Sequence, residues 1–324
     1  MFENKKILVI GGTGTIGQAL VNKLISYNPE VIRILSRDEF KQYQMQQQLE
    51  GYKNIRFLLG DVRDKERIYK AMHGIDIVFN LAALKHVPSC EYNPFEAVKT
   101  NVLGTQNVIE CAIENNVKNV IYASSDKAVS PTNTMGATKL LAERLIASAD
   151  YWKGGKIPVF AAVRFGNVIG SRGSVVPLWE EQIVGRKEIT VTDPNMTRFM
   201  ISIGSAVNLT LRACEIAKGG EIFVLKMPVI RLGDLAEVVL DKVCSEKGIA
   251  KDEVNTRVVG LRPGEKMYEE LMTVDEAQYA VEFDDMFAIQ HLSNITLPSN
   301  KPKEFRSDMC SIVEKSSIWS MLID

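Results

Sequence analysis

The chain has 324 residues, of which 46% are hydrophobic and 24% are charged, so it is long enough for one large core or for two unequal lobes. Its 39 lysines and arginines face 40 aspartates and glutamates, and a net charge of -1 excludes the strongly basic balance of nucleic-acid-binding proteins. No apolar run is long enough to span a membrane, and no signal-peptide cleavage site follows the first residues. We therefore expect a cytoplasmic protein without a nucleic-acid or membrane partner. The five cysteines form no CxxC pair, which indicates reduced thiols and no metal site.

Short apolar runs alternate with amphipathic stretches through the first half of the chain, as in a parallel sheet with connecting helices. The predicted strands are residues 6–10, 31–36, 55–59, 77–81, 119–124 and 159–165. The predicted helices are residues 18–26, 40–49, 65–72, 95–115 and 136–148. This pattern predicts an α/β fold of the Rossmann type, a doubly wound parallel sheet, over residues 1–176.

The regular alternation lapses after about residue 175. The predicted elements there are helices at 178–184, 205–217 and 232–244 and a strand at 221–225. No flexible linker separates the two parts. We expect residues 177–324 to form a smaller C-terminal α/β lobe that binds the substrate and is interleaved with the first domain.

A glycine-rich turn links the first predicted strand to the first predicted helix, and residues 11–17 read GGTGTIG. Glycines allow a tight turn and bring backbone amides close to a pyrophosphate at the helix N-terminus. The strand before and the helix after favour a dinucleotide site over a turn that is only close-packed. The predicted cofactor contacts in this turn are Gly11, Thr13, Gly14, Thr15, Ile16 and Gly17.

The end of the second strand bears on the choice of cofactor. An acidic residue there suits the ribose diol of NAD, whereas Ser36 and Arg37 suit the 2′-phosphate of NADP. Asp38 and Glu39 follow at once and leave open NAD, or a helix cap without a ligand. Residues after the third and fourth strands are also expected to line the cofactor: Asp61, Val62, Ala82 and Ala83.

The fifth strand leads into Ser125, Asp126 and Lys127, and Lys139 follows on a predicted helix. An acid and a base at this edge of the sheet suit proton transfer beside a nicotinamide, although a surface salt bridge is the plain alternative. These features resemble the extended short-chain dehydrogenase/reductase superfamily. The superfamily's YxxxK motif here reads MGATK, with Met135 in place of the tyrosine.

One branch of that superfamily is similar over roughly residues 5 to 290, the UDP-N-acetylglucosamine 4,6-dehydratases of polysaccharide biosynthesis. The similarity rests on ALKHVP at 83–88, SDKAV at 125–129, RFGNV at 164–168, GSRGSVVP at 170–177, MTRF at 196–199 and RPGEK at 262–266. Several subfamilies of this branch carry methionine at the tyrosine position.

The resemblance implies that NADP oxidises C4 of UDP-GlcNAc, that water is eliminated across C5 and C6, and that the hydride returns to C6. Lys127 would be the base at C5, provided that burial near cationic groups keeps it neutral. Asp126 would be the acid at C6, Ser125 would hold the C4 hydroxyl, and Lys139 would order the nicotinamide ribose. Met135 cannot take the C4 proton, so Asp126 and water remain the alternatives.

Positive charges further along the chain suit the diphosphate of the substrate, although each can also be a solvated surface charge. The predicted substrate contacts are Lys85, Asn167, Arg172, Val175, Arg198, Arg262, Glu265 and Lys266. Lys85 and Asn101 are also expected near the cofactor. The resemblance implies a homo-oligomer.

Two other functions stay open, a UDP-hexose 4-epimerase and a non-catalytic NADP-sensing regulator. Within the dehydratases, the C5 configuration of the product can be retained or inverted. The string RPGEKMYEEL at 262–271 and Met135 resemble the retaining enzymes.

Overall fold

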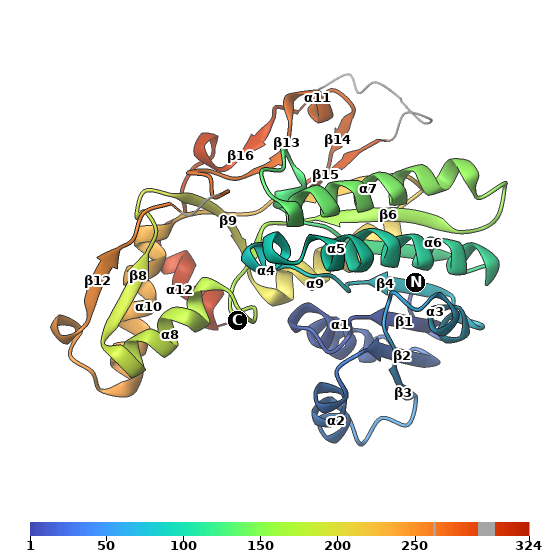
Figure 1. The fold of residues 1–324 in the computed structure, drawn as a ribbon, viewed down its shortest axis with the longest axis horizontal. Coiled ribbons are helices and arrows are strands. Elements are labelled where there is room, and N and C mark those ends of the chain that lie inside the picture. The colour runs from blue at the N-terminus through green and yellow to red at the C-terminus, as the bar shows by residue number, and fades with distance from the viewer. Residues whose placement is uncertain (262–263, 291–301, 324) are drawn as a thin grey trace.

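The computed structural model describes residues 1–261, 264–290 and 302–323 (Figure 1). Its main sheet, within these ranges, has nine strands in the order β14-β15-β10-β6-β5-β4-β1-β2-β3. These strands are β1 (Lys6–Ile10), β2 (Val31–Ser36), β3 (Ile55–Leu59), β4 (Ile77–Asn80), β5 (Asn119–Ala123), β6 (Val159–Arg164), β10 (Ile222–Leu225), β14 (Ala280–Glu282) and β15 (Met286–Ile289).

The strands from β3 to β10 run parallel, and β15 pairs antiparallel with both β10 and β14. The strand order reverses between β1 and β4, which is where a doubly wound sheet opens a crevice for a dinucleotide. The predicted Rossmann-type fold is thereby confirmed.

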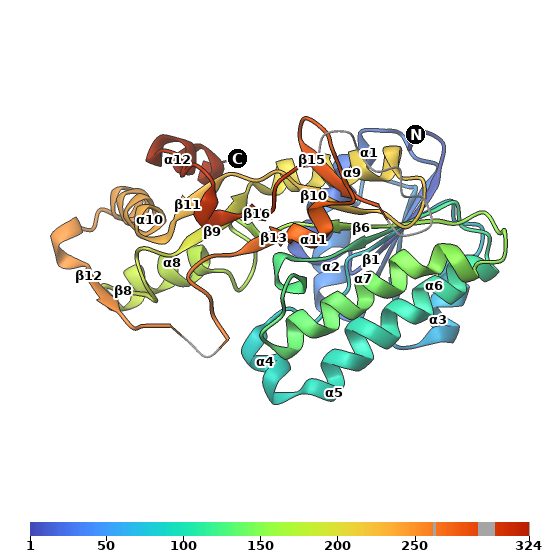
Figure 2. The ribbon, with the colours of Figure 1, turned by 90° about the horizontal axis from the view of Figure 1, so that it is seen from above.

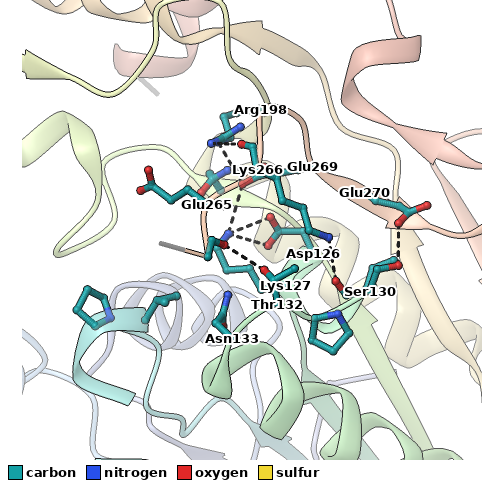
Figure 3. Close-up of a pocket in the computed structure, with 16 residues that line it drawn as sticks. Asp126, Lys127, Ser130, Thr132, Asn133, Arg198, Glu265, Lys266, Glu269 and Glu270 are labelled. Atoms are coloured by element: carbon teal, nitrogen blue, oxygen red, sulfur yellow. Dashed lines mark hydrogen bonds and ion pairs between the residues drawn. The ribbon is translucent and has the colours of Figure 1, made fainter. Parts of the chain in front are cut away.

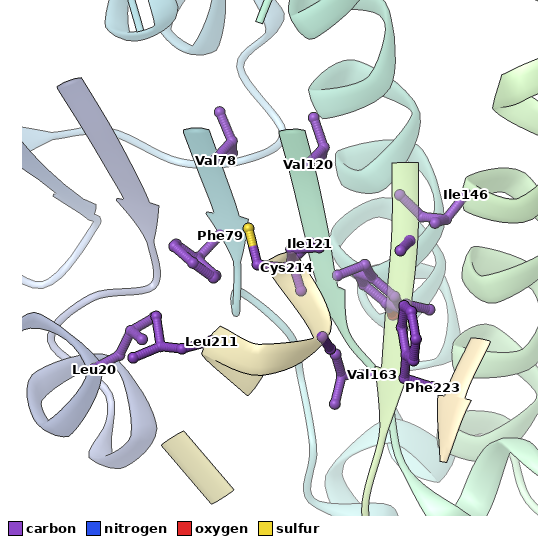
Figure 4. Packing of buried hydrophobic residues seen from close by; sticks show 14 of the residues in the cluster. Leu20, Val78, Phe79, Val120, Ile121, Ile146, Val163, Leu211, Cys214 and Phe223 are labelled. Atoms are coloured by element: carbon purple, nitrogen blue, oxygen red, sulfur yellow. The ribbon is translucent and has the colours of Figure 1, made fainter. Parts of the chain in front are cut away.

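Helices cover both faces of this sheet (Figure 2). One face carries α1 (Thr15–Ile25) and α9 (Ile203–Ile216), and the other carries α3 (Lys65–Met72), α6 (Gly104–Glu114) and α7 (Thr134–Trp152). Leu20 of α1 and Leu211 and Cys214 of α9 pack against Phe79 and Ile121 of the sheet, and all five side chains are buried (Figure 4). A further helix, α2 (Glu39–Gln48), follows β2.

The single helix predicted over residues 95–115 is wrong in detail. The chain first forms α4 (Val87–Tyr92) and α5 (Pro94–Ala97), and then a π-helical segment η1 (Val98–Leu103) before α6. The residues that join α5, η1 and α6 keep helical dihedral angles, so η1 is a bulge within one run of helix. Such bulges turn a side chain out of the regular helical spacing, and here η1 carries the fully buried Asn101.

The smaller lobe contains α8 (Val175–Arg186), α10 (Leu232–Lys247), η3 (Lys251–Glu253) and α12 (Lys315–Ile323). Its strands are β7 (Asn167–Val168), β8 (Glu188–Val191), β9 (Thr197–Ile201), β11 (Val229–Arg231) and β12 (Asn255–Val258), in the orders β11-β9-β7 and β12-β8. Its separate core includes the buried Trp179, Ile183, Leu235 and Ile318. The strands β13 (Glu270–Met272) and β16 (Phe305–Arg306), with α11 (Val274–Ala277) and η5 (Ser307–Met309), join this lobe to the main sheet.

The two lobes are interleaved along the chain. After β9 the chain returns to the main sheet in α9 and β10, leaves it again for β11, α10 and β12, and returns in β14 and β15. In the described ranges, no helix is long and apolar enough to cross a bilayer.

Candidate active site

A short 3-10 turn, η2 (Asp126–Ala128), follows β5 and carries the predicted acid and base. The backbone N–H of Asp126 donates to the carbonyl of Phe165 at 3.1 Å, which ties η2 to the end of β6. The Ser125 hydroxyl donates to Asp126 Oδ1 at 2.6 Å. Two parallel strands therefore hold Asp126 at the carboxyl edge of the sheet.

Lys127 lies between two carboxyl groups (Figure 3). Its Nζ is 3.1 and 2.9 Å from Asp126 Oδ1 and Oδ2, and 3.4 Å from Glu269 Oε1. Lys127 and Asp126 form the ion pair of the plain alternative, but the Asp126 side chain is only 2% exposed, so this is not a solvated surface pair.

The charges at this site differ from the expectation that Lys127 is kept neutral. Burial lowers the pKa of Lys127, but the negative charges of Asp126 and Glu269 outweigh it, and the pKa is raised above the ordinary value. Burial raises the pKa of Asp126, but the Lys127 charge and the hydrogen bonds from Ser125 and Lys127 lower it more. The resting site therefore holds an ammonium at Lys127 and a carboxylate at Asp126, because the contacts of Lys127 Nζ with Asp126 and Glu269 stabilise the positive charge.

Glu269, just before β13, is a site residue that the sequence analysis missed. Its Oε2 accepts from Asn167 Nδ2 at 2.9 Å, and its Oε1 lies 3.3 Å from Arg198 Nε. Burial and the Asp126 charge raise the pKa of Glu269 to about 7. The one signal in the sequence was its place in the string RPGEKMYEEL, next to the residues that were chosen.

These groups line a cavity of about 240 Å³ between the two lobes. The predicted residues that the fold brings together in its wall are Asp126, Lys127, Asn167, Arg198, Glu265 and Lys266. The Arg198 guanidinium donates to the carbonyls of Thr197 and Lys266 at 2.8 and 3.0 Å. Lys266 Nζ donates to the carbonyl of Ser130 at 2.8 Å. Arg198 and Lys266 thus hold the 264–269 segment against η2, whereas Arg262 lies outside the described residues.

The glycine-rich turn has the close packing that a dinucleotide cradle needs. Gly11 has a φ of +79°, and a Cβ there would lie 2.9 Å from the backbone nitrogen of Ala82. A Cβ on Gly17, in the first turn of α1, would lie 2.6 Å from the carbonyl oxygen of Gly11. At the end of β4, Asn80 Nδ2 is buried without a hydrogen-bond partner. A nucleotide bound beside this turn could approach the backbone closely at the glycines and could accept a hydrogen bond from Asn80 Nδ2.

Arg172 and Lys85 lie on this side of the site, away from the cavity. Arg172 Nη2 donates to the carbonyl of Thr13 at 2.6 Å, and its backbone N–H donates to Thr15 Oγ1 at 3.2 Å. Lys85 Nζ donates to the carbonyl of Arg172 at 2.8 Å. The 170–174 loop therefore covers the glycine-rich turn, and α8 starts beyond it at Val175.

The segment after β2 contains the helix cap that was one of the alternatives. Asp38 is the N-cap of α2 and accepts from the backbone N–H of Lys41 at 3.0 Å, so the cap interpretation is correct for Asp38. Ser36 Oγ accepts from Gln42 Nε2 at 3.0 Å. The Arg37 side chain is 56% exposed, and its Nη1 forms an ion pair with Asp61 Oδ2 at 3.7 Å. Val62 is buried, and Ala82 and Ala83 are half-buried.

Behind the site, three residues act as supports. Lys139 Nζ donates to the carbonyl of Ala123 at 2.8 Å, and burial lowers the pKa of Lys139 to about 8. The Asn101 amide binds both backbone groups of Leu84 and also Thr138, so it holds the loop after β4. Met135 is 4% exposed and packs with Cys90 and Ala97.

The fold and the site fit one family of known proteins, because the polysaccharide biosynthesis protein family matches residues 7–291. The chain belongs to that family. Relatives of this chain include proteins named as sugar-nucleotide dehydratases and epimerases. The expected resemblance to UDP-N-acetylglucosamine 4,6-dehydratases is confirmed.

Three relatives each align with 89% of this chain. A protein of Methanocaldococcus jannaschii named as an uncharacterized membrane protein is 51% identical over 86% of its length. A UDP-N-acetylglucosamine 4,6-dehydratase (inverting) of Campylobacter jejuni and a UDP-glucose 4-epimerase of Rickettsia canadensis are each 42% identical over 84% of their length. The X-ray structure of Pen from Bacillus thuringiensis is 49% identical, with a TM-score of 0.94, and the match covers 99% of this chain and 98% of Pen.

Proposed function

We propose that this protein is a UDP-N-acetylglucosamine 4,6-dehydratase that uses NADP. The observation that carries the proposal is the set of the buried Asp126 and the half-buried Lys127 and Glu269 in one cavity wall beside the nucleotide crevice. Eliminating water requires both a base and an acid, and this set provides them. A 4-epimerase has no use for an acid at C6, and a regulator without catalysis has no use for either group.

The glycine-rich turn, the start of α1 and Lys139 would hold the cofactor, with Ser36 and Arg37 at its 2′-phosphate. When bound, the nicotinamide would supply the oxidation at C4 and the later reduction at C6. Arg172 and Lys85 would cover the cofactor's pyrophosphate, because they lie over Thr13 and Thr15. Asn167, Arg198, Glu265 and Lys266 would border the sugar nucleotide in the cavity.

Lys127 would remove the C5 proton and Asp126 would protonate the leaving C6 hydroxyl. For this, a proton must first move from the Lys127 ammonium to a carboxylate, because the resting charges are the reverse of those that the reaction needs. Both groups lie on η2, so one face of the sugar meets the base. A single group that removes and returns the C5 proton on one face supports retention at C5, as does the string RPGEKMYEEL.

The reaction itself can be tested in deuterated water with UDP-GlcNAc as the substrate. We expect mass spectrometry to show a product that has lost one water and carries one solvent deuterium, placed at C5 by the returning base. Proton NMR of product made in ordinary water, where C5 carries a proton, is expected to show the couplings of the C5-retained xylo product. The couplings of the C5-inverted arabino product would overturn the proposed retention at C5 but would still support dehydration. A product of unchanged mass with an inverted C4 would instead identify an epimerase.

The cofactor choice predicts a selective loss when Arg37 is removed. Arg37→Ala is expected to weaken NADP binding by about 1.5 to 3 kcal/mol, roughly tenfold to a hundredfold, because a charge-assisted contact to the 2′-phosphate is lost. NAD, which lacks that phosphate, serves as the internal control and should bind almost as before. Calorimetric titration of both cofactors measures the difference. An equal loss of affinity for NADP and NAD would show that Arg37 is a solvated charge that does not contact the 2′-phosphate.

A further inference from the structure

The proposed reaction assigns no task to two carboxyl groups of the cavity wall, Glu269 and Glu270, and of these Glu269 contacts Lys127. It comes from the segment before β13, in the C-terminal part of the chain, whereas Asp126 and Lys127 come from η2. Its side chain is 13% exposed, and its backbone N–H donates to Ser307 Oγ at 2.9 Å. The carboxyl group is therefore held against Lys127 by contacts from the smaller lobe.

The two carboxyl oxygens of Glu269 have different surroundings. Oε2 accepts a hydrogen bond from Asn167, which fixes the plane of the group. Oε1 faces Lys127 Nζ at 3.4 Å and Arg198 Nε at 3.3 Å. Oε1 is thus the oxygen that can exchange a proton with Lys127.

The charged groups that face Glu269 come from two elements. Asp126 and Lys127 lie on η2, and Arg198 lies on β9. On the neighbouring strand β16, Arg306 is bound to Asp308 at 2.8 Å. The nearby carboxylate of Asp126 makes it costly to ionise Glu269 as well, and a hydrogen bond from protonated Glu269 to Asp126 favours the neutral form.

We propose that Glu269 is a proton relay between Lys127 and Asp126. This inference rests on the proposed dehydration and assigns to Glu269 a role that acts through those two groups. In the first step an N–H bond of the Lys127 ammonium breaks and an O–H bond forms at Glu269 Oε1. Lys127 becomes a neutral amine, and Glu269 becomes a neutral carboxylic acid.

In the second step Glu269 passes this proton to the Asp126 carboxylate, and Asp126 gives it to the C6 hydroxyl as the C6–O bond breaks. The C5–H bond breaks at the same stage, its proton goes to Lys127, and the electron pair forms the C5–C6 double bond. Water leaves, and Lys127 is again an ammonium with both carboxylates ionised. The relay thus resolves the mismatch between the resting charges and the roles of Lys127 and Asp126.

Glu269→Gln tests the relay, since glutamine keeps the shape and can still bind Asn167, but cannot carry the proton. We expect kcat for UDP-GlcNAc to fall by about 10²-fold, the lower end for a lost proton-transfer group. The wild-type rate should decline as the pH falls below about 7, where Glu269 takes up a solvent proton and can no longer accept one from Lys127. This decline should be absent in Glu269→Gln and present in Glu269→Asp, which restores an ionisable group.

A second measurement does not depend on turnover. Infrared difference spectra between about pH 6 and pH 8 should show the carbonyl band of a protonated carboxyl group that is lost in Glu269→Gln. Glu282→Gln is the matched control, because Glu282 on β14 forms an exposed pair with Lys226. A Glu269→Gln enzyme with the wild-type rate and pH profile would overturn the relay, even though the wild type dehydrates UDP-GlcNAc. A wild type that gives no dehydration while the band titrates would overturn the proposed function.

Discussion

Lys127→Ala is expected to lower the rate of water loss from UDP-GlcNAc by about 10²- to 10⁴-fold, because it removes the group that we propose takes the C5 proton. The proposed NADP cofactor should remain bound, since Lys127 lies on η2 in the cavity wall and the expected cofactor crevice is built by the turn before α1. The rate is measured by product formation, and cofactor retention by the absorbance of the purified protein. Near-normal dehydration would remove Lys127 from the mechanism.

Two further variants separate the base from its charge. Lys127→Arg keeps a positive charge between Asp126 and Glu269, but a guanidinium does not give up its proton at neutral pH. Lys127→Arg should therefore be as inactive as Lys127→Ala. Unlike Lys127→Ala, it keeps a positive partner for the carboxyl groups of Asp126 and Glu269. Lys118→Ala is the control, because Lys118 forms an exposed pair with Asp76 away from the cavity. Activity in Lys127→Arg would show that the site needs the charge and not the base.

The second large effect concerns stability. Arg164 at the end of β6 is fully buried and binds both oxygens of Glu143 on α7, at 3.0 and 2.7 Å. It also binds both oxygens of Glu276 on α11, at 2.9 Å each. Arg164→Met is expected to lower the free energy of unfolding by about 3 to 5 kcal/mol, because it leaves two carboxylates unpaired in the interior.

Denaturant titration measures this loss, with Arg212→Ala as the control. Arg212 forms an exposed pair with Asp285, and such pairs contribute about 1 kcal/mol or less. A loss for Arg164→Met no larger than that of the control would mean that the two carboxyl groups are neutral in the fold.

The first half of the fold was predictable because its strands are buried on both faces. Such strands read as continuous apolar runs, and the predicted 6–10, 31–36 and 55–59 match β1, β2 and β3. The start of α7 was missed by two residues, since its true cap is Asn133, whose Oδ1 accepts from the N–H of Gly136. The bulge η1 has no hydrophobic pattern that distinguishes it from the helix around it, so it could not be predicted from the sequence.

The site was only partly predictable, for a reason of distance along the chain. Asp126 and Lys127 follow a strand directly, and their place at the sheet edge is a consequence of the fold. Glu269 contacts Lys127 although the two are 142 residues apart in the sequence. The strands of the smaller lobe that bring them together have no hydrophobic periodicity from which they could be predicted. The protonation of Lys127 depends on that contact, so its charge could not be derived from the residues next to it.

The interleaved path of the chain limits how this protein can be cut and recombined. A fragment ending near residue 176 would leave β6 as an open edge, because its neighbour β10 is contributed only at Ile222–Leu225. The smaller lobe is likewise assembled from segments on both sides of β10. An exchange of substrate lobes between relatives therefore needs several junctions, and it must carry Glu269 with the lobe while η2 stays with the sheet. In each such exchange, the proposed proton path from Lys127 through Glu269 to Asp126 would have to form again across the new contact between the lobe and η2.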